Sequence, residues 1–488
     1  MSRWLSGLIR LGNRLPDPVF LFVGATAAVA LLSALGAALG WAVPHPAGGG
    51  TIQVRSAFEP ALVERLLTEM PRTFAGFPPL GTVLVMMLGI AVAERSGLLD
   101  AALGGLVRRV PPRALSAALV FAGVMSSLAA DAGYVVLVPL GAALFAAAGR
   151  PPLAGLAATF AGVSAGFSAN LLLTALDPLL AGLTEAAARL LEPGRSVSPA
   201  CNYYLMAALV PLYTLAGAWV TERWVAPRRA GETAAGPVPA PAADPAAARG
   251  LRAAGWVALA WLGLVLWLLR PEGGALRAED GGLAPFYRAL VALMFLLFFA
   301  CGWAYGRAVG RFRRGADLIG AMQSGMADMA YYLVLAFFAA HFIALFDWTG
   351  LGRAGAVLGA QGLAALAAPA PVLLLGLVLL SGLVNLFIGS ASAKWALLAP
   401  VFVPMFMLLG LPPEATQAAY RIGDSATNIV TPLMPYFPLV LVFARRYRPE
   451  LGIGGLIGLM WPYALVFAAV STLALLLWWA AGWPLGPA

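Results

Sequence analysis

Two polar segments interrupt otherwise apolar sequence, and they constrain what this chain can fold into more than any other feature. Each combines small hydroxyl side chains, an amide, a carboxylate and at least one proline. Inside a bilayer such groups are costly unless they line a cavity or bind a ligand. The repeated pattern therefore predicts a functional site built from two copies. The first segment supplies Ser168, Asn170, Thr174, Asp177 and Pro178, and the second supplies Asp424, Ser425, Thr427, Asn428, Thr431, Pro432 and Pro435.

The composition indicates that the solvent of this chain is a lipid bilayer. Of its 488 residues, 61% are hydrophobic and 11% are charged, and the mean hydropathy is +0.86. The core of a water-soluble protein could not bury this much apolar surface. The net charge of +9 comes from short basic clusters between apolar runs, so it does not indicate nucleic-acid binding. Cys201 and Cys301 form no paired-cysteine motif, and the sequence has no phosphate-binding loop, so we expect no cofactor, no structural metal and no ATP hydrolysis.

Nine apolar runs predict membrane-spanning helices, and the first of them is too long to be a signal peptide. Two further apolar stretches, 134–190 and 395–443, are interrupted by polar residues and prolines. We therefore expect an all-α polytopic membrane protein with about nine transmembrane helices and two re-entrant helical hairpins that carry the polar segments. The nine runs cover residues 19–43, 80–93, 114–128, 203–220, 256–269, 289–303, 331–346, 372–387 and 456–479.

Arginine clusters beside these runs predict the orientation, because cytoplasmic loops carry an excess of Lys and Arg. The N-terminus is expected in the cytoplasm and the C-terminus outside. The Ala- and Pro-rich stretch 227–250 is typical of a flexible cytoplasmic linker, and it divides the chain into halves 1–226 and 251–488. The clusters are Arg3, Arg10 and Arg14; Arg95, Arg108, Arg109 and Arg113; Arg223, Arg228, Arg229, Arg249 and Arg252; Arg307, Arg311, Arg313 and Arg314; and Arg445, Arg446 and Arg448.

The two halves share a plan of span, polar hairpin, Pro-Pro connection and broken segment. Pro139 and Pro151 are 12 positions apart, as are Pro400 and Pro412. By the arginine pattern, the first copy begins in the cytoplasm and the second begins outside. An inverted-topology repeat with interrupted segments is typical of secondary transporters. The copies cover about 112–190 and about 369–444.

Neutral oxygens dominate both polar segments, and such oxygens suit a hard cation such as sodium. The carboxylates of Asp177 and Asp424 can take up a proton or balance a cation. A sodium ion or a proton is therefore the expected coupling ion. The alternative is that the hydroxyls and amides only hold helices together by hydrogen bonds. The predicted ion-binding residues are Ser168, Asn170, Thr174, Ser425, Thr427, Asn428 and Thr431.

The second copy also carries charged and aromatic side chains. Lys394 is the only lysine of the chain, and it can either hold a substrate carboxylate or extend from a hairpin tip to the membrane interface. Its neighbour Trp395 can stack on an aromatic ligand or belong to the interfacial belt. Arg421 precedes Asp424 by one helical turn, so the two can pair with each other or act as a substrate-anion clamp and a coupling carboxylate.

Four motifs, at residues 11–18, 166–179, 385–395 and 420–428, resemble the AbgT family of p-aminobenzoyl-glutamate transporters, and the resemblance runs along nearly the whole chain. The resemblance implies a homodimer of nine-helix protomers, each with two re-entrant hairpins, a dimerising scaffold and a transport core. It also implies transport of p-aminobenzoyl-glutamate or related folate-pathway compounds, with export of sulfonamide antimetabolites by some members. By this resemblance the functional positions are Asp177, Ser392, Trp395, Pro413, Arg421, Asp424 and Pro432.

The expected function is therefore ion-gradient-driven transport of an aromatic carboxylate by alternating access, in the cytoplasmic (inner) membrane. Its partners would be the substrate, the bilayer and a second copy of the chain. Import or export, and sodium or proton coupling, stay open. A sodium-coupled dicarboxylate carrier is one alternative, since it needs the same oxygen-rich segments but has less use for an aromatic stacker. An intramembrane enzyme that uses Asp177 and Asp424 as an acid pair is another.

Overall fold

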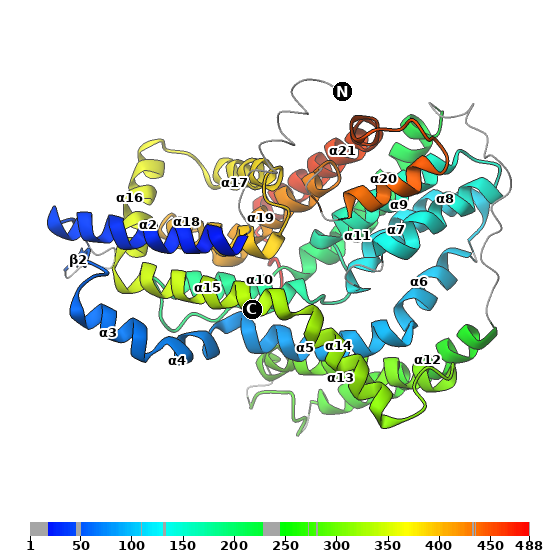
Figure 1. Ribbon diagram of the computed structural model, residues 1–488, viewed down its shortest axis with the longest axis horizontal. Coiled ribbons are helices and arrows are strands. Elements are labelled where there is room, and N and C mark those ends of the chain that lie inside the picture. Colours follow the sequence, from blue (N-terminus) through cyan, green and yellow to red (C-terminus); the bar gives the residue numbers. More distant parts are fainter. Residues whose placement is uncertain are drawn as a thin grey trace.

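The computed structural model of the chain consists almost entirely of helices (Figure 1). It describes residues 18–44, 50–108, 110–129, 133–227, 245–271, 273–279, 282–431, 434 and 436–487. Within these residues the one sheet is an antiparallel pair of short strands, β1 (Ala42–Pro44) and β2 (Thr51–Gln53). The predicted all-α class is confirmed.

The helices of the first half begin with α2, which precedes the strands. They are α2 (Pro18–Ala38), α3 (Pro60–Thr68), α4 (Met70–Ala75), α5 (Pro78–Ser96), α6 (Leu98–Arg108), η1 (Pro112–Ala114), α7 (Leu115–Met125), η2 (Ser126–Ala129), η3 (Gly133–Leu137), α8 (Val138–Ala147), α9 (Pro152–Ala165), η4 (Gly166–Ser168), α10 (Leu176–Ala188), α11 (Tyr203–Val220) and η5 (Thr221–Val225).

The second half starts with a helix that leads directly into a predicted span. Its helices are α12 (Pro245–Leu268), α13 (Ala284–Ala308), α14 (Gly315–Asp328), α15 (Ala330–Trp348), α16 (Leu351–Ala365), α17 (Ala370–Asn385), α18 (Ala391–Leu408), α19 (Pro413–Asn428), α20 (Phe437–Arg445) and α21 (Ile453–Ala480).

Several of these helices are suited to crossing a membrane. In the part of the chain that the structure describes, seven are long and apolar enough: α2, α11 with η5, α12, α13, α15, α18 and α21. Helices α16 and α17 would make an eighth span together, but the chain bends by 119° between them. The predicted spans 80–93 and 114–128 correspond to α5 and to the 11-residue helix α7. The chain is thus a polytopic membrane protein.

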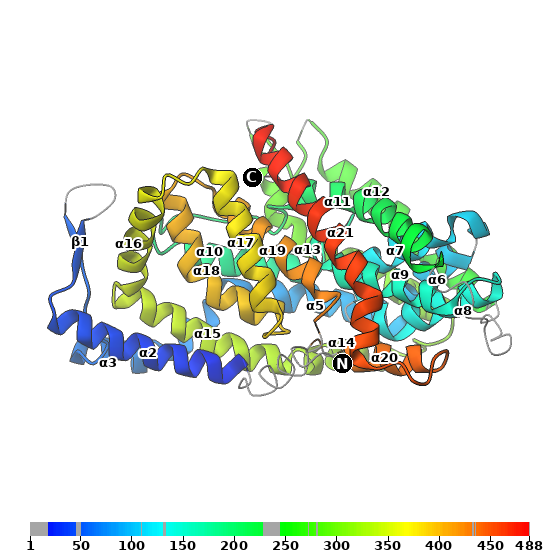
Figure 2. The same cartoon turned by 90° about the horizontal axis from the view of Figure 1, so that it is seen from above.

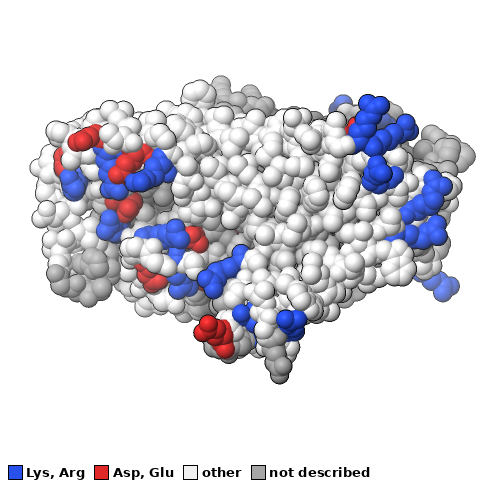
Figure 3. All heavy atoms as spheres, turned by 90° about the horizontal axis from the view of Figure 1, so that it is seen from below, with Lys and Arg blue, Asp and Glu red and all other residues white. Residues whose placement is uncertain are grey.

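The surface also fits a bilayer. On the face that Figure 3 shows, one group of charged side chains extends from the left end to the lower middle and another lies at the right end, with an uncharged zone between them. Large apolar side chains are exposed on the candidate spans, for example Leu215 of α11 at 67% and Trp256 of α12 at 73%. Lipid tails can cover such side chains, whereas water would make their exposure costly.

The two predicted copies have the same order of elements. In the first, α7 is followed by a break, then α8, α9, a non-helical stretch and α10. In the second, α17 is followed by a break, then α18, α19, the end of that helix at Asn428, and α20. Helix α7 packs against α9 as α17 packs against α19. In Figures 1 and 2, α7 and α8 lie toward one end of the long axis while α17 and α18 lie toward the other.

Two boundaries at the ends of predicted segments differ from expectation. The first span ends at Ala38 rather than at residue 43, because Gly40 turns the chain into β1 with a φ of +66°, a conformation that favours glycine. At the other boundary, residues 245–250 of the predicted linker are the first residues of α12. Residues 228–244 of that linker lie outside the described residues.

Helix α18 also differs from expectation. The prolines of residues 395–443 were expected to interrupt the chain, yet α18 continues through Pro400 and Pro404 and is long enough to span a membrane. Proline is tolerated inside membrane helices because neighbouring groups can satisfy the backbone atoms that it leaves free. The interruptions in this copy fall instead before α18, after Asn385, and at the end of α19, after Asn428.

Glycine allows the helices of each copy to approach closely. In the second copy, a Cβ atom at Gly423 of α19 would collide with the backbone carbonyl of Val378 on α17. In the first copy, a Cβ atom at Gly162 of α9 would collide with the carbonyl of Val120 on α7. Small residues at such contacts are a common means of packing helices in membranes.

We expect Gly423→Ala to destabilise the protein, because α17 and α19 would have to separate to admit the methyl group. The expected loss is about 1–3 kcal/mol, seen as a lower thermal unfolding temperature of the purified protein. Gly376→Ala on α17 is the matched control, since nothing lies within 4 Å of its Cβ position. Equal unfolding temperatures for the two variants would contradict the close contact.

Candidate transport site

Helix α19 carries a stripe of polar side chains through the interior of the protein. Gln417, Arg421, Asp424 and Asn428 follow one another at helical spacing, so they lie on one face of the helix. None of the four is more than 5% exposed. The helix packs against α17 and α21, on either side of it in Figure 2. So many polar groups in an apolar interior mark a functional site.

Arg421 joins the second copy to the first. Its Nη1 donates to Oδ1 of Asp177 at 2.6 Å, and its Nη2 donates to the carbonyl oxygen of Phe167 at 2.7 Å. The other carboxylate oxygen of Asp177 accepts from the backbone N–H and the hydroxyl of Thr174, at 2.6 and 2.9 Å. Asp177 therefore holds the segment that leads into α10, and it lies in the first turn of that helix, where the helix dipole favours a negative charge. Pro178 lies in that turn, so it begins the helix rather than breaking one.

Lys394 makes the second buried ion pair. Its ammonium contacts Oδ1 of Asp424 and the amide oxygen of Asn385, and neither side chain of the pair is more than 3% exposed. The amide nitrogen of Asn385 donates to the backbone carbonyl of Asp424 at 2.9 Å and to Oδ1 of Asn428 at 2.8 Å. Lys394 is thus a core residue and does not reach the membrane interface. The pairing of Arg421 with Asp424 is not formed, since each binds a residue of another helix.

Trp395 faces protein on all sides. It is fully buried and stacks on Tyr420, with ring centroids 4.5 Å apart and an interplanar angle of 23°. Its indole N–H donates to the hydroxyl of Thr184 on α10 at 2.9 Å, and that hydroxyl donates to Gln417 at 2.6 Å. Trp395 therefore links α18 with α10 and α19, and its ring face is occupied by tyrosine in this conformation.

Most of the predicted ion-binding side chains already have protein partners. In the first copy, Ser168 lies 3.3 Å from the hydroxyl of Tyr213, and Asn170 donates to Ser127 at 2.8 Å. In the second copy, Thr427 and Thr431 donate to backbone carbonyls of α19, at 2.8 and 2.7 Å.

Ser425 is the exception. Its buried hydroxyl has no hydrogen-bond partner among the described residues. It follows Asp424 directly in α19, so a buried oxygen that is free to bind lies within the same turn of the helix. The hydroxyl of Thr431 donates its proton to a carbonyl, so its oxygen lone pairs can also serve a cation, whereas the oxygen of Thr427 already accepts from the amide of Asn385 at 2.8 Å and has one lone pair left.

The remaining predicted positions lie at the edges of this network. Pro413 is the first residue of α19, where a proline needs no N–H partner. Ser392 lies in the first turn of α18, with its hydroxyl 3.3 Å from that of Ser390, which caps the helix. Pro432 and Pro435 lie outside the described residues.

Sequence reasoning missed several members of the network. Thr184, Gln417 and Tyr420 hold Trp395, and Asn385 orients both Lys394 and Asp424. Helical spacing could have identified Gln417, because it precedes Arg421 by four positions and so lies on the same helix face as Asp424 and Asn428. No local pattern marks Thr184, because its partners come from α18 and α19.

Within the described residues, no group of three or more His, Cys, Asp or Glu side chains is arranged to hold a metal ion. The fold and the site instead define a polytopic membrane transporter, in which one buried ion pair, Arg421–Asp177, joins two structural copies near broken helices, and a second pair, Lys394–Asp424, lies within the second copy.

The comparisons with known proteins identify the family. Residues 3–488 match the family described as "AbgT putative transporter family", and the chain belongs to this family. It is 36% identical over 486 residues to the p-aminobenzoyl-glutamate transport protein of Escherichia coli (strain K12), across 98% of this chain and 95% of the relative. The family consists of transporters, so the alternative of an intramembrane enzyme is excluded.

Two solved structures share the fold. The Alcanivorax borkumensis YdaH transporter, described as having an unusual topology, has a TM-score of 0.94 and 48% identity, over 97% of this chain and 100% of its own. The structure of Neisseria gonorrhoeae MtrF, described as illuminating a class of antimetabolite efflux pumps, has a TM-score of 0.90 and 41% identity, over 98% of this chain and 97% of its own.

We expect Arg421→Gln to destabilise the protein by about 3–5 kcal/mol, because it leaves the carboxylate of Asp177 buried without a counter-charge. The double variant Arg421→Gln with Asp177→Asn should recover much of that loss, and thermal unfolding of the purified proteins measures both. Arg353→Gln is the control: it removes a pair with Asp347 whose side chains are 38% and 37% exposed, so it should cost no more than about 1 kcal/mol. A double variant no more stable than Arg421→Gln alone would contradict the pairing.

Proposed function

We propose that this chain is an ion-gradient-driven secondary transporter of p-aminobenzoyl-glutamate or related aromatic carboxylates, working by alternating access. The names of its relatives support the substrate class. The observation that carries the proposal is the placement of two buried ion pairs, Arg421–Asp177 and Lys394–Asp424, on successive turns of one helix.

Arg421 supplies the substrate-binding group in this proposal. Its planar guanidinium suits a carboxylate, which it can bind through two parallel N–H groups. One of its N–H groups already donates to Asp177, whereas the Nε atom has no hydrogen-bond partner among the described residues. A carboxylate of the substrate can take the place of Asp177, which removes one of the side-chain contacts between α19 and α10. Binding would thereby loosen one copy from the other.

Lys394 and Asp424 supply the coupling group. The ammonium of Lys394 occupies the cation position beside Asp424 and Asn385. A sodium ion or a proton that reaches Asp424 would compete with Lys394 for the carboxylate. The hydroxyl of Ser425 and the oxygens of Thr427 and Asn428 lie within four residues along the chain and can complete a sodium site.

The distribution of charge on the surface supports the orientation in the membrane that we propose. The charged atoms at one end of the long axis are mostly basic in Figure 3, whereas those toward the other end are of both signs. This supports placing the basic end in the cytoplasm, with the N-terminus inside and the C-terminus outside the cytoplasmic membrane. A homodimer within the bilayer completes the proposal.

A sodium-coupled dicarboxylate carrier is the second candidate, and one observation favours it. The ring of Trp395 already stacks on Tyr420, so it offers no free face to an aromatic substrate in this conformation. Uptake of labelled p-aminobenzoyl-glutamate into proteoliposomes, with unlabelled succinate or p-aminobenzoyl-glutamate as the competitor, separates the two candidates. Succinate that inhibits this uptake as strongly as unlabelled p-aminobenzoyl-glutamate does would contradict a preference for the aromatic substrate.

We expect Asp177→Asn and Asp424→Asn to lower gradient-driven flux of p-aminobenzoyl-glutamate by roughly tenfold or more, since each removes one member of a buried charge pair that must exchange partners. Flux is measured in proteoliposomes with sodium and proton gradients imposed separately and in each direction. Asp347→Asn, in the half-exposed pair with Arg353, should transport like the parent protein. Parental rates for correctly inserted Asp177→Asn and Asp424→Asn would show that these carboxylates have no coupling role.

A further inference from the structure

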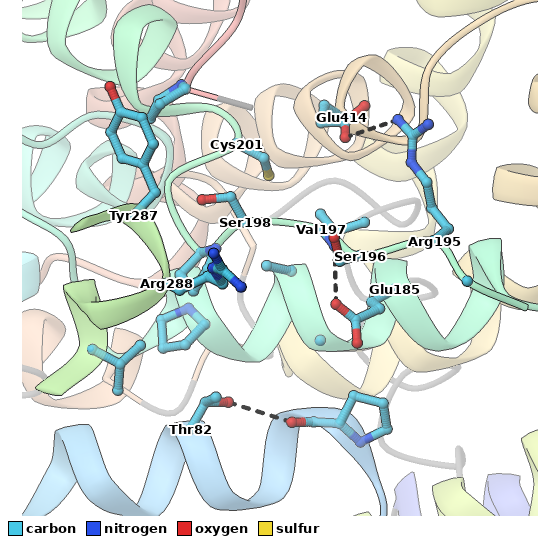
Figure 4. A pocket seen from close by; sticks show the side chains of 18 residues that line it. Thr82, Glu185, Arg195, Ser196, Val197, Ser198, Cys201, Tyr287, Arg288 and Glu414 are labelled. Carbon is cyan, nitrogen blue, oxygen red and sulfur yellow. Dashed lines mark hydrogen bonds and ion pairs between the residues drawn. The ribbon is translucent and has the colours of Figure 1, made fainter. Parts of the chain in front are cut away.

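A pocket of about 760 Å³ lies beside the helices that carry the site (Figure 4). Its volume is within the roughly 300–1,000 Å³ typical of small-molecule pockets. Helices α5, α10, α13 and α19 and the connection between α10 and α11 form its walls. Pro487, close to the C-terminus, also lines it, so the predicted orientation places it on the outer side.

The pocket wall reaches the transport site without exposing it. Pro178 lines the pocket and directly follows Asp177, whose side chain is fully buried. Cys201 lines it too, and its sulfur accepts from Gln417 on α19 at 3.4 Å. Gln417 in turn connects through Thr184 to Trp395. A molecule in this pocket would therefore lie against both helices that form the Arg421–Asp177 pair.

An ion pair forms part of the pocket wall. Arg195, in the connection after α10, contacts Glu414 in the first turn of α19 at 3.3 Å, and Figure 4 shows the two side chains facing each other. Their side chains are 37% and 22% exposed, so water and solutes can reach them. Because Glu414 lies at the N-terminus of a helix, its charge stays stabilised when Arg195 leaves it. The pair can therefore open without leaving a buried charge.

We propose that this pocket is the outer vestibule of the transport path, in which Arg195 binds the carboxylate of an incoming or departing aromatic solute in place of Glu414. The Arg195–Glu414 pair then acts as a latch between the α10–α11 connection and α19. Tyr287 on the opposite wall supplies an aromatic surface for the solute. The identity of the solute rests on the proposed function. The opening of the Arg195–Glu414 latch does not depend on it.

The natural cysteines provide the test. Cys201 is 3% exposed, and burial raises the pKa of its thiol, so it should react slowly while the latch is closed. Cys301→Ala leaves it as the single cysteine of the 488-residue chain. The rate of Cys201 labelling by a membrane-impermeant maleimide, added to the outside of intact cells, reports how often the vestibule opens. Cys201→Ser confirms the labelled position.

In the Cys301→Ala background, Glu414→Gln should raise the labelling rate roughly twofold to fivefold, the range that an ion pair of this exposure can account for. Arg195→Gln should raise it similarly. The control Arg353→Gln breaks a comparable pair outside the vestibule and should leave the rate unchanged. Unchanged rates in both latch variants, or labelling only from the cytoplasmic side, would overturn the proposal.

Solute protection tests the anion site. With the latch removed by Glu414→Gln, p-aminobenzoyl-glutamate should bind Arg195 and slow the labelling by at least about threefold, whereas in Arg195→Gln it should give no protection. Equal protection in both variants would overturn the role of Arg195. If the solute is transported but protects neither variant, the vestibule site is wrong while the proposed function stands. If it is neither transported nor protective, while Glu414→Gln still speeds labelling, the substrate assignment and the anion site fail and the latch remains.

Discussion

The contact between Arg421 and Asp177 is the interaction on which the rest of the site depends. It joins the last helix of the first copy to the central helix of the second, and both side chains are almost completely removed from solvent. A buried pair of this kind contributes little net stability, yet the loss of either partner is costly. Another anion can therefore take the place of the Asp177 carboxylate at Arg421. Removing either partner without such a replacement leaves a buried charge unpaired.

The second buried pair lies one turn further along α19, and the two pairs have different chemistry. Arginine keeps its charge and presents a planar set of donors, which suits a carboxylate, whereas lysine is a compact cation that a sodium ion or a proton can replace. A movement of α19 affects both pairs, because both are anchored on one rigid helix. Binding of an organic anion and of a cation can thus be linked without a long relay through the protein.

Much of this architecture could be predicted from the sequence, because apolar runs long enough to span a membrane and a repeated polar segment can be recognised from local sequence alone. The sequence also indicated Asp177, Lys394, Arg421 and Asp424 as the charged residues of the site. Their pairing could not be predicted, since the spacing of Arg421 and Asp424 allows a local pair and only the packing of α10 and α18 against α19 supplies the observed partners. The burial of Trp395 depends on Tyr420 and Thr184, which no motif connected with it. The continuity of α18 through two prolines likewise depends on neighbouring helices.

The most direct test of this account measures the affinity of purified Asp177→Asn protein for p-aminobenzoyl-glutamate by titration calorimetry, beside the parent protein. If the substrate carboxylate competes with Asp177 for Arg421, removing the carboxylate of Asp177 should tighten binding several-fold, even though gradient-driven transport is lost. Weaker or unchanged binding in Asp177→Asn would contradict the account, because it would show that the buried pair and the substrate do not compete for the same guanidinium.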